Sequence, residues 1–428
     1  MKKTERDFII RLIKREVVPA IGCTEPIAVA LCVSKAARLL GKEPEKIKVL
    51  LSANILKNAM GVGIPGTGMI GLPIAVALGA LAGNPDYQLE VLKDITSDDV
   101  ERGKQVIAEN RIDIQLKENI AEKLYIEVIM SAGPDETTAI ISGGHTCFVY
   151  EARNGNVLLD ERISAVAEES EEDGSLSLHK VYDFALTAPL DEIDFILDSA
   201  RLNKAAAEAS FKGDYGHSLG KSLRNDNERR VMGDSVFTRI LSYTSGACDA
   251  RMAGAMIPVM SNSGSGNQGI AATLPVVVYA EENQKSREEM IRALVLSHLT
   301  VIYIKQSLGR LSALCGCVVA ATGSSCGITY LMGGGYEEMT YAVKNMVANL
   351  TGMICDGAKP SCAMKLTSGV STAVFSAMLA MEHKCVTAVE GIIENDVDRT
   401  IHNLTRIGAQ GMNETDRLVL DIMTHKCP

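Results

Sequence analysis

Five of the eleven cysteines are grouped in one part of the sequence, with a spacing that could hold a metal centre. They lie beside glycines or at breaks between predicted helices: Cys315, Cys317, Cys326, Cys355 and Cys362. Structural zinc usually needs four thiolates or imidazoles in tight Cys-x2-4-Cys pairs, and no two such pairs exist here. An iron–sulfur cluster tolerates looser spacing, and three thiolates can hold it with one iron open to substrate. Ordinary packing stays open as well, because free cysteine is among the most buried residue types.

A further cysteine stands where a helix is predicted to begin, in the segment PAIGCTEPIAVAL. Thr24 is a good N-cap and Pro26 suits a first helical turn, so we expect Cys23 just before a helix whose amides point toward it. Such a position favours a thiolate over a thiol. The alternative is a capped helix in which the cysteine is incidental. Cys32 falls on the apolar face of the same helix and is predicted to be a core residue.

Two glycine-rich segments could bring the backbone close to a ligand. The run MSNSGSGNQGIAATLPVV (260–277) places Ser, Gly and Asn ahead of an apolar helix, where amides and hydroxyls can bind a carboxylate or phosphate. It could equally form a tightly packed turn. The segment GVGIPGTGMIGLP (61–73) matches neither a P-loop nor a GxGxxG after a strand, so we do not predict nucleotide binding.

The composition indicates a globular protein with a small-molecule ligand. At 428 residues the chain exceeds the size at which one hydrophobic core keeps growing, so we expect two domains. The formal net charge of −10 would repel a phosphate backbone, and no Lys/Arg cluster compensates locally. Nucleic acid is therefore not an expected partner.

The sequence predicts neither an export signal nor a membrane span. Charges interrupt every apolar run of residues 1–18, so we interpret them as an amphipathic helix. The most apolar stretch, 68–83, carries Pro73 and four glycines and is short for a membrane crossing, so we expect a buried helix. We therefore expect no membrane partner and a cytoplasmic location, where cysteines serve as packing residues, metal ligands or reactive thiols.

The pattern of apolar residues predicts an α+β protein in three parts. Residues 1–45 form an N-terminal helical segment, which we expect to pack on the C-terminal domain. Residues 46–185 form an α/β module, and residues 186–428 form a mostly helical domain. The module thus lies between two helical regions of the sequence.

Several individual elements can be predicted within these parts. KIKVLL (46–51) and KLYIEVIM (123–130) predict strands, and Asn154-Gly155 between two apolar runs predicts a hairpin turn. The acidic run 168–174 is typical of a solvated loop. Residues 287–308 are apolar almost all round in their second half, as expected of a helix buried in an α domain.

In their order and distances these segments resemble the L-cysteine desulfidase family, relatives of the iron–sulfur L-serine dehydratases that carry a serine-dehydratase α-type domain. The resemblance spans nearly the whole chain: GCTEP, then NSGSGNQGIAATLP, LCGC, ICDGAKPSC and GGG. It implies that the helical domain is catalytic and binds a [4Fe-4S] cluster through Cys315, Cys355 and Cys362, with Cys317 as competitor for the first position. It also implies Cys23 as the catalytic base, and a homodimer.

Two departures separate the chain from the serine dehydratases. Those enzymes have SSHT where this chain has GCTE, and their third ligand lies farther from the second than Cys362 lies from Cys355. Both differences point to the desulfidase branch. In the dehydratases a C-terminal cysteine can cap the open iron; here that residue would be Cys427, although a tail thiol is more commonly frayed.

The resemblance implies β-elimination of L-cysteine to pyruvate, ammonia and sulfide. The open iron would act as a Lewis acid on the leaving sulfur, and Cys23 would take the α-proton. The candidates for binding the carboxylate or ammonium of the amino acid are Thr24, Ser263, Ser265 and Asn267.

Three other functions are compatible with these residues. An L-serine dehydratase would use the same mechanism with water as the leaving group. A pyridoxal-phosphate lyase would need SGSGNQG around the phosphate and Lys57 as the imine lysine, but such enzymes seldom have a long helical half. A non-catalytic metal or redox sensor would close its site with four protein ligands. We interpret His145 and His217 as structural.

Overall fold

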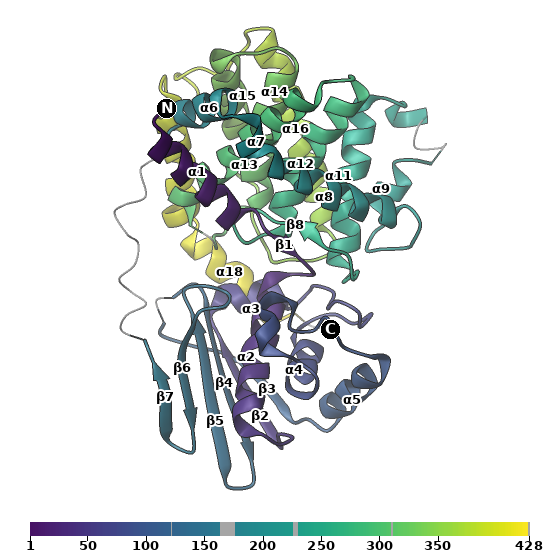
Figure 1. The fold of residues 1–428 in the computed structure, drawn as a ribbon, viewed down its shortest axis with the longest axis vertical. Helices are drawn as coiled ribbons and strands as arrows, with labels where there is room; N and C mark the ends of the chain where they lie inside the picture. Colours follow the sequence, from purple (N-terminus) through teal and green to yellow (C-terminus); the bar gives the residue numbers. More distant parts are fainter. Residues whose placement is uncertain (121, 163–175, 226–229, 310, 427–428) are drawn as a thin grey trace.

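The computed structural model describes residues 1–120, 122–162, 176–225, 230–309 and 311–426. It is a mixed α+β protein in which a large helical part stands on a smaller part built around a sheet (Figure 1). The predicted acidic loop at 168–174 and Cys427 lie outside the described residues.

The smaller part is built on a six-stranded sheet of order β3-β2-β4-β5-β6-β7. Only β2 and β3 run parallel; the other neighbours are antiparallel. The predicted strands and hairpin are confirmed, since Asn154 and Gly155 join β6 and β7 with φ of 49° and 80°. The strand bounds are β2 Lys46–Leu51, β3 Ile112–Leu116, β4 Tyr125–Ala132, β5 Asp135–Ser142, β6 Phe148–Arg153 and β7 Asn156–Asp160.

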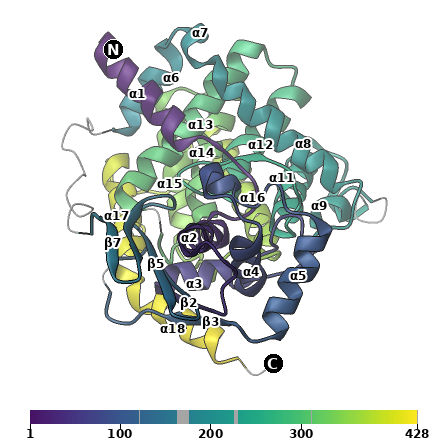
Figure 2. The ribbon, with the colours of Figure 1, turned by 60° about the horizontal axis from the view of Figure 1, so that its bottom comes forward.

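One face of this sheet is covered by α2 (Thr24–Leu40), which Figure 2 shows nearly end-on between the sheet and α4 (Leu72–Leu81). Every second residue of β4 is buried, so its apolar side chains face that helix. The helix α4 is almost wholly buried, as predicted for the apolar stretch 68–83. The start of α2 is thereby held firmly, and the start of α2 is where Cys23 stands.

The helical part is arranged around two long helices that approach each other closely, α13 (Arg287–Leu308) and α14 (Gly316–Leu331). A Cβ at Gly323 would lie 2.4 Å from the carbonyl oxygen of Ser297, so only glycine allows this approach. The predicted buried helix at 287–308 is confirmed as α13. Around this pair lie α11 (Val236–Met252), α12 (Gly266–Glu282), α15 (Tyr336–Leu350) and α16 (Cys362–Met381).

The N-terminal segment is divided between the two parts, which differs from the prediction for residues 1–45. The first helix, α1 (Lys3–Glu16), buries Ile9, Leu12 and Ile13 in the helical core, whereas α2 belongs to the core of the sheet. Between them, β1 (Pro19–Ala20) pairs antiparallel with β8 (Val259–Met260). That short pairing places the GCTE turn beside the serine- and glycine-rich segment that follows β8.

The boundary after the sheet also differs from the prediction at 185. The helix α6 (Leu178–Thr187) buries Leu178, Val181 and Phe184 in the helical core, because its apolar residues recur every three or four positions. The other described elements are α3 Ala53–Ala59, α5 Ser97–Ala108, α7 Leu190–Ile193, α8 Leu197–Ser210, α9 Leu219–Ser222, α17 Val397–Arg406, α18 Asn413–Thr424, the 3-10 helices η1 Pro85–Glu90 and η3 Asp194–Ile196, and the π-helix η4 Ile407–Gly411.

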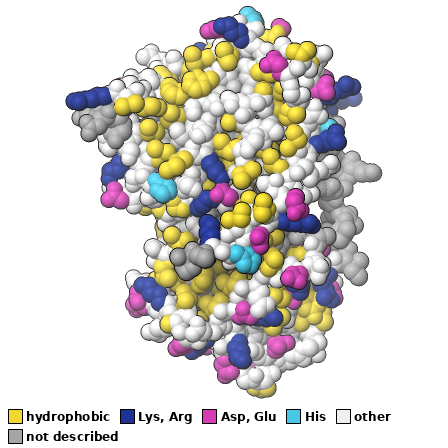
Figure 3. Space-filling view, turned by 180° about the vertical axis from the view of Figure 1, so that it is seen from behind, with side chains coloured by type: hydrophobic (Ala, Val, Ile, Leu, Met, Phe, Trp, Pro, Cys, Tyr) yellow, Lys and Arg dark blue, Asp and Glu magenta, His cyan; other side chains and the backbone are white. Residues whose placement is uncertain are grey.

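On the face seen in Figure 3, charged side chains of both signs are interspersed, and hydrophobic side chains gather over the helical part. In the part of the chain that the structure describes, one helix, α16, is long and apolar enough to cross a membrane, and half of it is buried in the protein as in a core helix. Its exposed apolar residues are Met364, Phe375, Met378 and Leu379.

Candidate functional site

Segments far apart in the sequence meet at one cavity of about 100 Å³. Its walls come from the start of α2, the start of α12 and the segments that lead into α14 and α16. Five of the predicted cysteines line it: Cys23, Cys315, Cys317, Cys355 and Cys362. The cavity therefore unites a residue near the N-terminus with residues from the last third of the chain.

Cys23 occupies the N-cap position of α2, one residue before the position predicted from Thr24. Its side chain is buried, with 3% exposed. Its Sγ donates to Glu25 Oε2 at 3.5 Å and accepts from Arg251 Nη2 at 3.6 Å. The thiol thus lies between an acceptor for its proton and a cation for its sulfur.

The buried setting of Cys23 corrects the expectation of a ready thiolate. Burial raises the pKa of the thiol to about 12; Arg251 opposes this increase, and Glu25 adds to it. The loss of water around the sulfur outweighs the field of the helix N-terminus, which the sequence alone suggested. Before Cys23 can act as a base, its proton must pass to an acceptor, and Glu25 is the carboxylate already bonded to it.

Thr24 lines the cavity, but Ser263 does not. The Thr24 hydroxyl donates to Gly264 O at 3.0 Å and to Glu25 Oε2 at 3.1 Å, which ties the GCTE turn to the glycine-rich turn. Ser263 has a φ of 49°, and its hydroxyl donates to Asn262 Oδ1 at 2.8 Å. The structure therefore does not bring Ser263 to the cavity, because the tight turn directs its hydroxyl to its neighbour.

Ser265 and Asn267 both line the cavity, and both stabilise its wall through hydrogen bonds to neighbouring residues. Ser265 caps α12 by accepting from the Gln268 amide at 3.4 Å. Asn267 Oδ1 accepts from Arg251 Nη1 at 3.0 Å and from Cys248 Sγ at 3.5 Å. The hydrogen bond from Arg251 fixes the guanidinium beside Cys23.

The three predicted cluster ligands are held by neighbouring backbone segments. Cys315 is the N-cap of α14, Cys362 is the first residue of α16, and Cys355 lies between α15 and α16. The Cys355 amide donates to Ala313 O at 2.7 Å, and the Cys315 amide donates to Met353 O at 3.0 Å. This short antiparallel pairing holds the first two cysteines side by side.

The three predicted ligands are thiols that line one cavity, and thiols are the donor type that an iron–sulfur cluster uses. Among the described residues, no three His, Cys, Asp or Glu side chains lie close enough to share one metal ion. In a cluster, each thiolate binds a different iron atom, so wider spacing is expected. Burial raises the pKa of Cys355, and raises that of Cys362 to about 11; the charge of Cys315 adds to both increases. The thiols are therefore near enough to repel one another when ionised, which a cationic metal core would relieve.

Cys317 also lines the cavity, but its thiol is held differently from that of Cys315. Its Sγ donates to Lys365 O at 2.9 Å, and a Cβ at Gly369 would lie 2.7 Å from the sulfur. The Cys317 sulfur is thus packed against α16 and its proton is engaged with a backbone carbonyl, whereas Cys315 is the N-cap residue of α14. This difference favours Cys315 as the ligand. Cys32, which was predicted to be a core residue, is fully buried and does not line the cavity.

Seven polar residues that the sequence did not single out also line the cavity: Glu25, Asn58, Arg251, Gln268, Lys305, Ser312 and Lys365. Glu25 and Gln268 stand inside the segments already noted, as the fourth letter of GCTE and as the residue after Asn267. No local pattern marks Arg251, which reaches the cavity from the end of α11. Only the packing of α11 against α12 reveals it.

Lys57 supports the segment that carries Cys355 and does not line the cavity. Its ammonium group donates to Cys355 O at 3.2 Å and is paired with Asp416 of α18; its side chain is 1% exposed. Asn54 donates to the other oxygen of the same carboxylate at 2.6 Å. Lys57, the imine lysine of the pyridoxal-phosphate alternative, is not among the residues that line the cavity.

We expect the substitution Lys57→Met to loosen the segment that carries Cys355. It leaves Asp416 without its cation, and because Asp416 keeps 18% of its side chain exposed, the cost should be about 2–3 kcal/mol, below that of a fully buried pair. Amide hydrogen exchange across residues 353–361 should become faster, with a lower thermal midpoint. Unchanged exchange in this variant would show that the pair does not support the segment. Lys204→Met, which breaks an exposed pair with Glu281, is the matched control.

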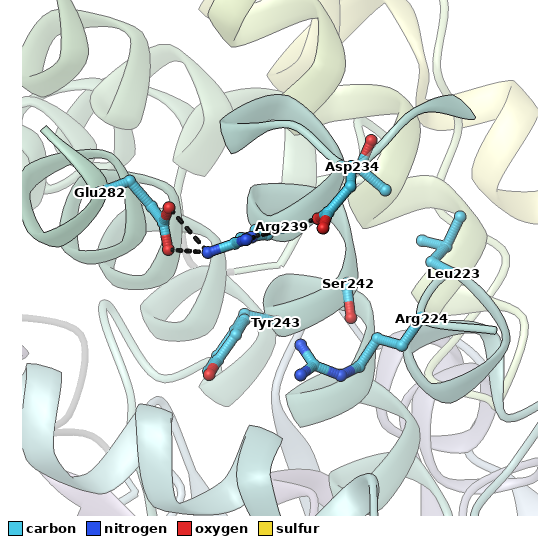
Figure 4. Close-up of a pocket in the computed structure, with 8 residues that line it drawn as sticks. Leu223, Arg224, Asp234, Arg239, Ser242, Tyr243 and Glu282 are labelled. Carbon is cyan, nitrogen blue, oxygen red and sulfur yellow. Dashed lines mark hydrogen bonds and ion pairs between the residues drawn. The ribbon is translucent and has the colours of Figure 1, made fainter. Parts of the chain in front are cut away.

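A second cavity, of about 230 Å³, lies on the helical part and contains none of the predicted site residues (Figure 4). Arg239 crosses it, bonded to Glu282 at 2.7 Å and to Asp234 at 3.4 Å. Arg224 lies over the rings of Phe211 and Tyr243. The two arginines of this second cavity thus already interact with other residues of the chain.

Comparison with known proteins gives a family match over most of the chain. The model of the serine dehydratase alpha chain family matches residues 86–421, which include all three predicted cluster ligands. UPF0597 proteins match over the full length of both chains, with 75% identity in Bacteroides fragilis, 58% in Porphyromonas gingivalis and 47% in Oleidesulfovibrio alaskensis. These relatives cover the GCTE segment, which precedes the family match.

Proposed function

Because the chain belongs to the serine dehydratase alpha chain family, a family of iron–sulfur lyase-type enzymes, we propose that it degrades L-cysteine to pyruvate, ammonia and sulfide. The observation that carries this proposal is the single cavity lined by Cys23 and by the three cluster cysteines. L-cysteine is favoured over L-serine by the GCTE segment and by the short spacing between Cys355 and Cys362.

Cys315, Cys355 and Cys362 would hold the [4Fe-4S] cluster. When bound through three thiolates, such a cluster has an iron without a protein ligand and supplies Lewis-acid chemistry toward a leaving group. Lys365 lines the same cavity, donates to Ile354 O at 2.9 Å and is ion-paired with Asp356, so its positive charge beside the thiols is partly balanced.

Cys23 would remove the α-proton of the amino acid. Its own proton first passes to Glu25 Oε2, and Arg251 then stabilises the thiolate across 3.6 Å. The thiolate takes the α-proton as the carbon–sulfur bond breaks and sulfide leaves. General base catalysis of this kind contributes about 10²–10⁴-fold. The remaining aminoacrylate tautomerises and hydrolyses in water to pyruvate and ammonia.

Exposed apolar side chains and free thiols support proposals for the assembly and the location of the protein. The exposed apolar side chains along α16 suit burial between two copies of the chain, so we propose a homodimer. The free thiols of the ten described cysteines suit the reducing cytoplasm, where we propose that the enzyme acts.

The test is the iron and acid-labile sulfide content of protein purified without oxygen, paired with sulfide and pyruvate release from L-cysteine before and after exposure to air. We expect about four iron and four sulfide per chain, and loss of activity in air. Faster release of pyruvate from L-serine would assign a serine dehydratase. Oxygen-stable turnover without iron would indicate pyridoxal phosphate, and a cluster without turnover would indicate a sensor.

A further inference from the structure

Three buried polar atoms on the cavity wall have no hydrogen-bond partner among the described residues: Arg251 Nε, Asn58 Oδ1 and Gln268 Oε1. Each of these side chains is at least nine-tenths buried. Burying a polar group without a partner costs free energy, so such groups are rare in a folded protein. Three of them around one cavity indicate a ligand that would complete their hydrogen bonds.

Arg251 Nε is the donor among the three atoms. Arg251 belongs to the end of α11, and its guanidinium lies beside the start of α12. Its Nη1 donates one hydrogen bond to Asn267 and its Nη2 donates one to Cys23, so each of these nitrogens keeps a second N–H, and Nε has no partner among the described residues. A Cβ at Gly266, the first residue of α12, would lie 2.2 Å from Nε, so the guanidinium is packed against the helix start. The first amides of a helix have no intrahelical acceptor and carry partial positive charge. The guanidinium and the helix start together make this part of the cavity wall electropositive, which suits an anion such as a carboxylate at the remaining Nη N–H groups.

The other two atoms are acceptors. Asn58 uses its Nδ2 to donate to Glu25 Oε1 at 3.3 Å, which leaves Oδ1 without a donor. Gln268 follows Asn267 in the first turn of α12 and presents a second carbonyl oxygen without a donor. Two acceptors in the same cavity as an anion site suit a ligand that carries both a carboxylate and an ammonium group.

We infer that Arg251 and the start of α12 bind the α-carboxylate of the amino acid, and that Asn58 and Gln268 accept hydrogen bonds from its α-ammonium. The inference rests on the proposed function for the identity of the ligand and adds the residues that recognise it. With the carboxylate on Arg251, the Cys23 sulfur lies beside the α-carbon, because the same guanidinium contacts it. Asn267 acts as a positioning residue that holds Arg251.

The test measures binding without turnover. L-alanine carries both head groups but no β leaving group, so cluster-loaded protein can be titrated with it by calorimetry under anaerobic conditions. We expect Arg251→Met to weaken L-alanine binding by about 10- to 100-fold, the range for losing charged hydrogen bonds. Arg251→Lys should lose less, because it keeps the charge but not the planar fork. Gln268→Met, which is close to isosteric, should weaken L-alanine binding while leaving propionate binding unchanged.

Arg224→Met is the matched control, since it removes an arginine from the second cavity and should leave L-alanine binding unchanged. Iron content and thermal midpoint verify that each variant folds, and Arg251→Lys carries the test if Arg251→Met does not fold. Wild-type affinity for L-alanine in the Arg251 variants, or no saturable binding by the wild-type protein, would overturn the inference. Binding as expected without cleavage of L-cysteine would refute the proposed function and uphold the inference; cleavage with unimpaired binding in Arg251→Met would do the reverse.

Discussion

Replacing Cys355 or Cys362 by alanine is expected to abolish both iron binding and lyase activity. Cys355 precedes α16 and Cys362 begins it, and the other described cysteines that line the cavity are Cys23, Cys315 and Cys317. With two thiolates left, the cluster would lose one of three protein ligands and should not survive purification. Iron and acid-labile sulfide per chain, measured on anaerobically purified variants, check this expectation.

Cys326→Ala is the matched control for these variants. Cys326 is fully buried in α14, in the same helical domain, but it does not line the cavity. It should keep the full iron content and lose only a little stability. Comparing Cys315→Ala with Cys317→Ala then decides the first ligand: we expect iron to be lost only from the former. A Cys355→Ala protein with about four iron per chain would refute the ligand assignment.

Replacing Cys23 by alanine should remove activity while the cluster stays bound. Cys23 caps α2 and packs against the core of the helical part, outside the backbone pairing that holds Cys315 and Cys355. Its loss removes the general base, so kcat should fall by about 10²–10⁴-fold. Initial rates of pyruvate release, divided by the iron content of each preparation, measure the effect.

Cys32→Ala is the control for this variant, because Cys32 is fully buried on the same helix and lies outside the cavity. It should retain activity and cluster together. If Cys23→Ala kept full turnover per cluster, the base would have to be another residue. If it lost iron as well, Cys23 would be a ligand and the fall in activity would have a different cause.

Local patterns in the sequence were sufficient for the regular elements. The strand at 46–51 and the helix at 287–308 have the predicted bounds, because an apolar run with defined flanks is a property of neighbouring residues. The Asn154-Gly155 turn is equally local, since both residues tolerate a positive φ. The division of residues 1–45 was not predictable in this way, because α1 is apolar on one side and α2 is apolar nearly all round, and nothing local says which core each joins.

The site could be predicted only in part, for a similar reason. Cysteines with informative neighbours, such as Cys23 and Cys355, were found from their segments and do line one cavity. Arg251 was not, because its importance comes from Cys23, Asn267 and Gly266, none of which is next to it in the sequence. The raised pKa of Cys23 depends on burial, which is a property of the packed protein and not of a helix N-terminus.

The ion pair between Lys57 and Asp416 has a consequence for biosynthesis. The two residues stand 359 positions apart. The ion pair that supports the segment carrying Cys355 can therefore form only when nearly the whole chain has left the ribosome. Chains emerge N-terminal part first, and the sheet-containing part can therefore fold well before α18 exists. Iron and sulfide delivery is expected to follow termination of translation, and a prematurely stopped chain should remain a metal-free protein whose thiols are open to oxidation.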